Sequence, residues 1–155
     1  MMPTMAPDPI CLTTDPRTAR VIAFYESLSL QTLNQLETVY SEDARFIDPF
    51  NDVASQLDIR RVFVHMFASL DTPRFEVLQA VTEADHCFLL WNFHFRRTAA
   101  AAPMLIHGAS HLRFASDGRV DWHRDHWDSS RELYEKLPLL GPVLRWLRRR
   151  LSAGR

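Results

Sequence analysis

Lysine, cysteine and long apolar runs are scarce in this chain of 155 residues. Lys136 is the sole lysine, so arginine carries almost all of the positive charge. The formal net charge of −1 gives no indication of a nucleic-acid partner. No apolar run approaches the roughly 20 residues that cross a bilayer, and residues 1–15 lack the basic and apolar segments of a signal peptide. We therefore expect a cytoplasmic protein.

The two cysteines, Cys11 and Cys87, lie far apart in the sequence, and their spacing matches no metal site. We expect no disulfide, which fits a reducing compartment, and no cofactor. Among the seven histidines, His107 and His111 would lie about 13 Å apart along one strand, too far to share an ion. A metal site built from His94, His123 and an acid is the alternative.

The composition, with 46% hydrophobic and 24% charged residues, is that of an ordinary globular protein large enough for one core. We divide the chain into a loose, proline-containing arm (1–14), one folded domain (15–138) and a basic amphipathic tail (139–155).

Helical patterns come first in the domain. Asp15-Pro16 predicts a helix start, because an acid caps the helix and proline suits its first turn. A short second helix is expected to reach Tyr40, followed by a strand over 44–50. Ser55 and Asp58 resemble a capping box before the clearest helix, whose apolar positions recur at helical spacing up to Leu70.

Strand patterns dominate after residue 73, over residues 75–81, 86–97 and 104–114. The segment 86–97 is apolar on both faces, as in a strand covered on both sides. Helices segregated from antiparallel strands indicate an α+β fold, with helices on one face of a curved sheet. Ser129 then begins a last helix that ends before Pro138.

The segment DGRVDWHRDHWD (117–128) is the most informative part of the chain. Asp117-Gly118 indicates a turn, and the strand after it would place Asp121, His123, Asp125 and Trp127 on one face. Because each buried charge needs a partner, such a face suits a cavity wall better than a core.

Three motifs carry a resemblance to a known family: YSEDARFIDPF (40–50), IRRVFVHMF (59–67) and the 117–128 segment. Together they resemble the nuclear transport factor 2-like superfamily, in its SnoaL-like and ketosteroid isomerase-like branch. The resemblance covers about residues 16–134 and implies a cone, with a curved antiparallel sheet around helices and a deep internal pocket. Isomerases, cyclases, hydrolases, dehydratases and non-catalytic binders all use this fold.

Two families within it imply roles for individual residues. By similarity to ketosteroid isomerase, the general base falls on Asp48, whereas the two oxyanion donors are replaced by Phe24 and Ser110. By similarity to limonene epoxide hydrolase, the water-activating acid falls on Asp125. Its partner positions are occupied by Asn92 and His94, and its early-strand tyrosine and asparagine by Phe46 and Asp48.

We therefore expect a pocket whose catalytic candidates are Asp125, Asp48, His94 and His123. The expected substrate-binding residues are Phe24, Tyr25, Phe46, Phe63, Phe88, Asn92, Ser110 and Trp127. Carboxylate–imidazole pairs in apolar surroundings are the usual groups of acid–base chemistry. The resulting hypothesis is an acid–base enzyme of isomerase, cyclase or hydrolase type acting on a small hydrophobic molecule.

Asp125, Asp48 and the pocket each have an alternative explanation without catalysis. Asp125 could instead be a structural acid paired with Arg113 or Arg96, and Asp48 could simply close a turn before Pro49. The whole pocket could bind a ligand without chemistry, or be incidental to an interaction protein.

Two surfaces suggest partners. Trp91, Phe93 and Phe95 would form an apolar patch on the outer sheet face, so we expect a homodimer through the sheet. In the tail, an apolar stripe surrounded by arginines fits weak contact with an anionic membrane surface. Packing of this stripe on its own domain or on a second copy is the alternative; its residues are Val143, Leu144, Leu147 and Leu151.

Overall fold

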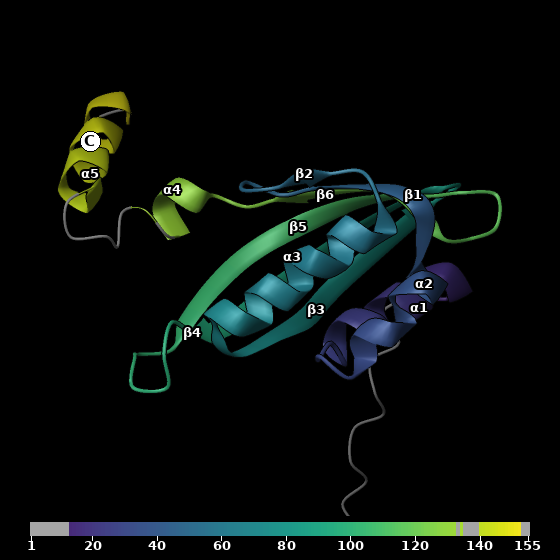
Figure 1. Ribbon diagram of the computed structural model, residues 1–155. Helices are drawn as coiled ribbons and strands as arrows, with labels where there is room; N and C mark the ends of the chain where they lie inside the picture. The colour runs from purple at the N-terminus through teal and green to yellow at the C-terminus, as the bar shows by residue number, and fades with distance from the viewer. Residues whose placement is uncertain (1–12, 133, 135–139, 153–155) are drawn as a thin grey trace, which may run out of the picture.

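The computed structural model describes residues 13–132, 134 and 140–152 and confirms the α+β fold (Figure 1). The elements run in the order α1 (Pro16–Glu26), the 3-10 helix η1 (Thr32–Gln35), α2 (Leu36–Val39), β1 (Tyr40–Ile47), β2 (Asp52–Val53), α3 (Gln56–Ser69), β3 (Asp71–Glu83), β4 (His86–Arg96), β5 (Met104–Phe114), β6 (Val120–His126), α4 (Ser129–Glu132) and α5 (Leu140–Leu151).

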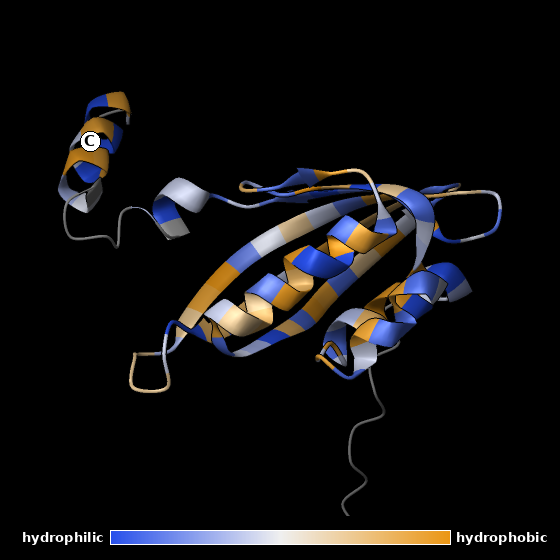
Figure 2. Cartoon of the chain, viewed as in Figure 1, coloured by the Kyte–Doolittle hydropathy of each residue, from blue (hydrophilic) through white to orange (hydrophobic). Residues whose placement is uncertain are grey.

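One curved six-stranded sheet forms the wall of the molecule, in the order β2-β1-β6-β5-β4-β3. All neighbouring strands are antiparallel except β1 and β6, which are parallel. The helix α3 lies across the hollow of this sheet and contacts β1 and β3, while α1 contacts β3 (Figure 1). Hydrophobic and hydrophilic residues alternate along the strands, as a sheet with one covered face requires (Figure 2).

The helix starts follow the caps expected from the sequence. The Asp15 carboxylate accepts hydrogen bonds from the backbone N–H of Arg17 and of Thr18, at 2.8 and 3.3 Å. At α3, Ser55 Oγ accepts from the backbone N–H of Asp58 at 3.1 Å and donates to its carboxylate at 2.8 Å. Each cap satisfies N–H groups that a helix start would otherwise leave unpaired, which is why both predicted starts are correct.

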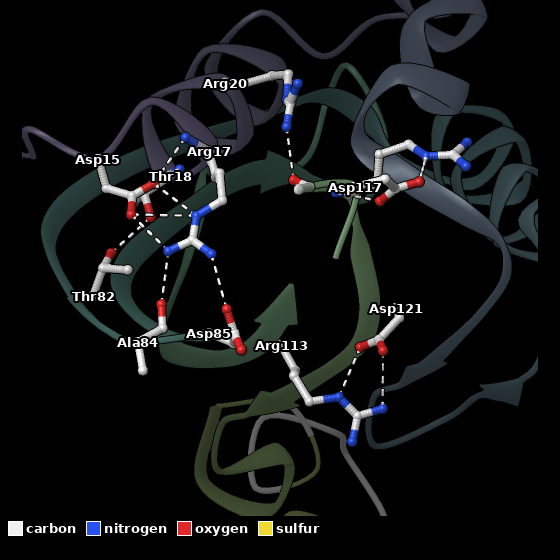
Figure 3. A network of polar contacts seen from close by, with 12 residues as sticks. Asp15, Arg17, Thr18, Arg20, Thr82, Ala84, Asp85, Arg113, Asp117 and Asp121 are labelled. Atoms are coloured by element: carbon white, nitrogen blue, oxygen red, sulfur yellow. Dashed lines mark hydrogen bonds and ion pairs between the residues drawn. The ribbon is translucent and has the colours of Figure 1, made fainter. Parts of the chain in front are cut away.

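Polar contacts fasten the first half of α1 to two turns of the sheet (Figure 3). Arg17 donates to the carbonyl of Ala84 at 2.7 Å and pairs with Asp85 at 3.1 Å, in the turn between β3 and β4. Arg20 donates to the carbonyl of Gly118 at 2.7 Å, in the turn between β5 and β6. With this end of α1 held, its last turn carries Tyr25 to the inner face of β6.

The faces of β4 are the reverse of those expected. Trp91, Phe93 and Phe95 are only 5, 8 and 5% exposed and lie on the inner face, covered within their own chain. The predicted dimer patch was therefore wrong. Because both faces of this strand are apolar, alternation alone could not show which one is covered.

Several boundaries also differ from expectation. Tyr40, expected at the end of a helix, begins β1, and β3 begins at Asp71 rather than at residue 75. The helix expected after Ser129 is described only as the short α4, and its predicted end at 133 and 135–138 lies outside the described residues. Among the helices described, none is long and apolar enough to cross a membrane.

Candidate active site

A cavity of about 550 Å³ lies between α3 and the inner face of the sheet. Its wall comes from the end of α1, the β1–β2 loop, α3 and the inward residues of β3 to β6. Nine aromatic side chains contribute to this wall: Tyr25, Phe46, Phe50, Phe63, Phe75, Trp91, Phe93, Phe95 and Trp127. A space of this size and character suits a small hydrophobic molecule.

Asp125, on β6, is one of three acids that line this cavity, with Asp48 and Asp58. Its Oδ1 accepts a hydrogen bond from Ser110 Oγ at 2.5 Å and lies 2.7 Å from His123 Nε2. Ser110 in turn accepts from the indole N–H of Trp91 at 2.8 Å, so its hydroxyl proton is directed at Asp125. In the described part of the chain, Oδ2 of Asp125 has no hydrogen-bond partner. One oxygen is thus held from behind and the other is left for a ligand.

Two tyrosines complete the network behind His123, which is 1% exposed. Tyr40 Oη lies 2.6 Å from His123 Nδ1 and 2.5 Å from Tyr25 Oη. Burial raises the pKa of both phenols, and for Tyr25 the neighbouring Tyr40 and Asp125 raise it further. Both tyrosines therefore keep their protons at neutral pH.

This network accommodates either charge state of His123. With a neutral imidazole, Tyr40 donates to Nδ1 and Nε2–H donates to Asp125. With a protonated imidazole, Nδ1–H donates to Tyr40, whose hydroxyl turns toward Tyr25. Because a hydroxyl can both donate and accept, neither state leaves a buried polar atom without a partner.

The SnoaL-like domain profile matches residues 21–123, well over half of the chain. The chain belongs to the SnoaL-like domain family. A search of curated protein sequences found no match.

Solved structures of SnoaL-like and related folds superpose on this SnoaL-like domain. A hypothetical protein from Catenulispora acidiphila DSM 44928 with a ketosteroid isomerase-like fold, in complex with trimethylamine, has a TM-score of 0.67 and 17% identity over 78% of this chain and 92% of its own. A protein from Shewanella putrefaciens CN-32, proposed to be a SnoaL-like polyketide cyclase, has a TM-score of 0.65 and 16% identity over 78% of this chain and 98% of its own. At these identities the likeness shows the fold alone, which is the cone expected from the sequence motifs.

The SnoaL-like domain brings part of the predicted site together. Asp125, Asp48, Tyr25, Phe46, Phe63 and Trp127 line the cavity, and His123 and Ser110 lie directly behind Asp125. The alternative that Asp125 pairs with Arg113 or Arg96 is wrong. Arg113 pairs with Asp121 at 2.8 Å, and Arg96 contacts backbone carbonyls.

Four predicted placements were wrong. His94, Asn92 and Phe88 lie on the outer face of β4, where His94 pairs with Glu76 at 2.9 Å. Their displacement follows from the reversed faces of that strand. Phe24 is buried in the core beside Tyr25 and does not line the cavity.

Asp121 also lies apart from His123 and Asp125. The pairing of β5 with β6 shifts register between Arg113 and Phe114, so Asp121 turns toward Arg113 on the outer side. A strand irregularity of this kind breaks the alternation on which the sequence analysis relied.

Asp48 has a structural role as well as a place at the cavity. Its carboxylate accepts from the backbone N–H groups of Phe50 and Asn51, both at 2.7 Å, and from Asn51 Nδ2 at 2.9 Å. It therefore closes the turn after β1, as the alternative interpretation expected, while still lining the cavity.

Several site residues were not predicted from the sequence. Tyr40 belongs to the network behind His123, and Trp91, Asp58, Arg61 and His65 line the cavity. No local pattern marks Tyr40, because the parallel pairing of β1 with β6 is what places it next to His123. Within residues 13–132, 134 and 140–152, no group of three or more histidine, cysteine or acidic side chains is placed to hold a metal ion.

Proposed function

We propose that the cavity is the active site of an acid–base enzyme of isomerase, cyclase or hydrolase type that acts on a small hydrophobic molecule. The observation that carries this proposal is the asymmetry of the Asp125 carboxylate. Ser110 and His123 hold Oδ1, while Oδ2 is left for a ligand in an aromatic cavity. Within the described residues nothing binds Oδ2, so this oxygen can accept a hydrogen bond or a proton from a molecule in the cavity.

In this mechanism, Oδ2 of Asp125 takes a proton from an acidic C–H of the substrate or from a water molecule. When the proton comes from a C–H, the C–H bond breaks, its electron pair stays on the substrate carbon, and Asp125 becomes a neutral acid. When it comes from water, the O–H bond breaks, the water oxygen bonds to the substrate, and the bond to the leaving group breaks with its electron pair on the leaving group. Asp125 then returns the proton to another atom of the substrate or to the leaving group. A substrate bound in the aromatic cavity displaces water from these steps and strengthens the interaction of each charge with its partners.

His123 sets the protonation of Asp125 in this scheme. Its Nε2–H donates to Oδ1 and so holds this oxygen in place behind the cavity. The tyrosine pair behind it keeps the imidazole oriented. Asp48 is either a second base or a group that orients the substrate, and His94 has no part in the site because it lies on the outer face.

A ligand-binding module without chemistry is the second candidate. The observation that favours it is the scarcity of hydrogen-bond donors facing Asp125 across the cavity. The Ser110 hydroxyl already donates to Oδ1 of Asp125 from behind, and the Tyr25 hydroxyl at the cavity already contacts Tyr40 and His123. An enzyme that forms an oxyanion needs donors aimed at it.

The test measures proton abstraction directly. Enolisable aryl ketones such as 2-tetralone are incubated with the protein in D₂O, and deuterium incorporation is followed by NMR. We expect the parent protein to accelerate exchange and Asp125→Asn to lower the rate about a hundredfold or more with binding nearly unchanged. Asp121→Asn is the matched control, since it removes the same charge from the outer side of the same strand. Ketones that bind but exchange equally fast with Asp125→Asn would establish the binding module instead.

We propose a homodimer through the outer face of the sheet as well. Val81, Phe88, Leu90 and Leu105 are 55, 51, 40 and 45% exposed there, although they stand on neighbouring strands. An apolar surface of this kind is typical of an interface. The residues differ from those first expected, but the face is again that of the sheet.

For the tail, we propose weak contact with an anionic membrane surface. Figure 1 shows α5 standing away from the sheet, and Val143, Leu147 and Leu151 are exposed. In the described part of the chain, its own domain therefore does not cover the stripe, and a second copy is the remaining alternative. We also retain the proposal of a cytoplasmic location, which the free, buried thiol of Cys87 supports.

A further inference from the structure

Some of the charged side chains that line the cavity form an ion pair with an opposite charge, and others do not. Asp58 and Arg61 form an ion pair at 2.6 Å on the α3 side, so their charges cancel locally. Asp48 accepts only from amide N–H groups. Asp125 accepts from a hydroxyl and an imidazole. In the lining described here, Asp48 thus has no cationic partner, and the imidazole of His123 is the sole basic group bound to Asp125.

An aromatic ring whose face is turned toward the cavity adds to this negative potential. The face of an aromatic ring carries negative charge density and its edge positive, so rings attract cations that approach their faces. The cavity lies among nine such rings, with Phe50 in contact with Trp127 at a centroid distance of 5.6 Å beside the Asp48 turn. Tryptophan gives the strongest interaction of this kind, and Trp91 and Trp127 both line the cavity.

The two arginines near the cavity do not neutralise the carboxylates of Asp48 and Asp125. Arg61 is held by Asp58, and Arg124 lines a separate hollow of about 380 Å³ at the ends of β1 and β6. That hollow shares Asp48, Asp125 and Trp127 with the main cavity, whereas Arg124 lines only the smaller hollow. A bound anion would face both carboxylates, and the one arginine in the main cavity is already paired.

We infer that the ligand of this cavity is a hydrophobic organic cation, a tertiary or quaternary ammonium group with an aryl or alkyl body. The inference rests on the proposed function, because it names the substrate class of the same site. The ammonium group lies between Trp127 and the carboxylates of Asp48 and Asp125, and the apolar body fills the space under α3. The positive charge would also increase the acidity of a neighbouring C–H, which is the bond that Asp125 is placed to break.

Isosteric probes test the charge separately from the shape. Phenyltrimethylammonium and tert-butylbenzene have nearly the same size and differ by one positive charge, and 4-tert-butylbenzoate supplies the negative counterpart. Binding is measured by calorimetry and by quenching of tryptophan fluorescence. We expect the cation to bind at least about tenfold more tightly than the hydrocarbon at low ionic strength, and the benzoate to bind most weakly.

Substitutions test whether Asp48 and Trp127 cause the preference for the cation. Asp48→Asn and Trp127→Leu should each lower the preference for the cation severalfold while leaving tert-butylbenzene binding within about twofold. Asp117→Asn is the matched control, because Asp117 likewise closes a turn by accepting a backbone N–H and lies outside the cavity lining. Asparagine keeps an acceptor oxygen for either turn, and circular dichroism checks that each variant is folded.

The outcomes separate this inference from the proposed function. Equal binding of cation and hydrocarbon, or tighter binding of the benzoate, would overturn the cation class and leave acid–base chemistry standing. A preference that survives in both Asp48→Asn and Trp127→Leu would also overturn it. Binding of the cation with no Asp125-dependent deuterium exchange would support the ligand class and overturn the enzyme.

Discussion

The indole of Trp91 lies against Gly108, its partner across the β4–β5 pairing. A β-carbon added to Gly108 would overlap the six-membered part of the indole ring. The same indole donates through its N–H to Ser110, which donates to Asp125. Gly108 is therefore required for the position of a ring that aligns the candidate catalytic acid.

Gly108→Ala should destabilise the fold by about 1–3 kcal/mol, because the methyl group has to displace a packed ring. It should also lower Asp125-dependent exchange, since the Trp91–Ser110 hydrogen bond is disturbed. Chemical unfolding measures the first effect and NMR the second. Trp91→Phe added to Gly108→Ala removes the clashing atoms and should recover part of the stability. A double variant that is as unstable as the sum of the single changes would contradict this account.

Alkaline pH should destabilise the protein through Tyr25 and Tyr40, whose pKa values are raised mainly by burial. Above about pH 10 the unfolded chain loses phenolic protons that the folded chain keeps. The unfolded state then binds fewer protons, so the free energy of unfolding falls as pH rises, by up to about 1.4 kcal/mol per pH unit for each tyrosine. Below pH 10 the pair contributes no pH dependence.

Urea unfolding between pH 9 and 11 measures this slope, and Tyr40→Phe should reduce it. A Tyr134→Phe background isolates the buried pair in absorbance at 295 nm, where no phenolate signal should precede unfolding. A phenolate signal from the folded protein near pH 10 would show that the pair is accessible to solvent.

Phe88→Arg should convert the proposed dimer to monomers, because it places a charge in the apolar outer face where Phe88 is 51% exposed. Sedimentation velocity at micromolar concentration gives the mass of each form. Leu57→Arg is the control, since Leu57 is an exposed apolar residue on α3, away from that face. This interface would be ruled out if the parent protein is a monomer, or if the Phe88→Arg variant is still a dimer.

Removal of residues 139–155 should lower co-sedimentation with phosphatidylserine-containing vesicles. The triple change of Arg148, Arg149 and Arg150 to Gln keeps the apolar stripe and should also weaken binding, because the charges supply the attraction to anionic lipid. Neutral vesicles give the baseline. Binding that is unchanged by the deletion would dispose of the membrane proposal.

Features set by contacts between residues close in the sequence could be predicted. Asp15 and Ser55 fix the starts of α1 and α3 through their own hydrogen bonds, so both helices could be foreseen. Asp125 could be foreseen from the 117–128 motif. The faces of β4 could not, because both are apolar and the choice depends on which of them α3 covers. Tyr40 meets His123 only through a strand pairing between segments 83 residues apart.

The parallel pairing of β1 with β6 has a consequence for how this fold can vary. Phe46 pairs with His123 and Ile47 with Arg124, so the two strands deliver Asp48 and Asp125 to the same end of the sheet, next to each other in register. Their spacing depends on one strand pair and not on the length of anything between them in the sequence. The segment from β2 to β5 supplies α3 and most of the aromatic wall. Insertions and exchanges there can reshape the chamber for a new ligand while the two acids keep their separation.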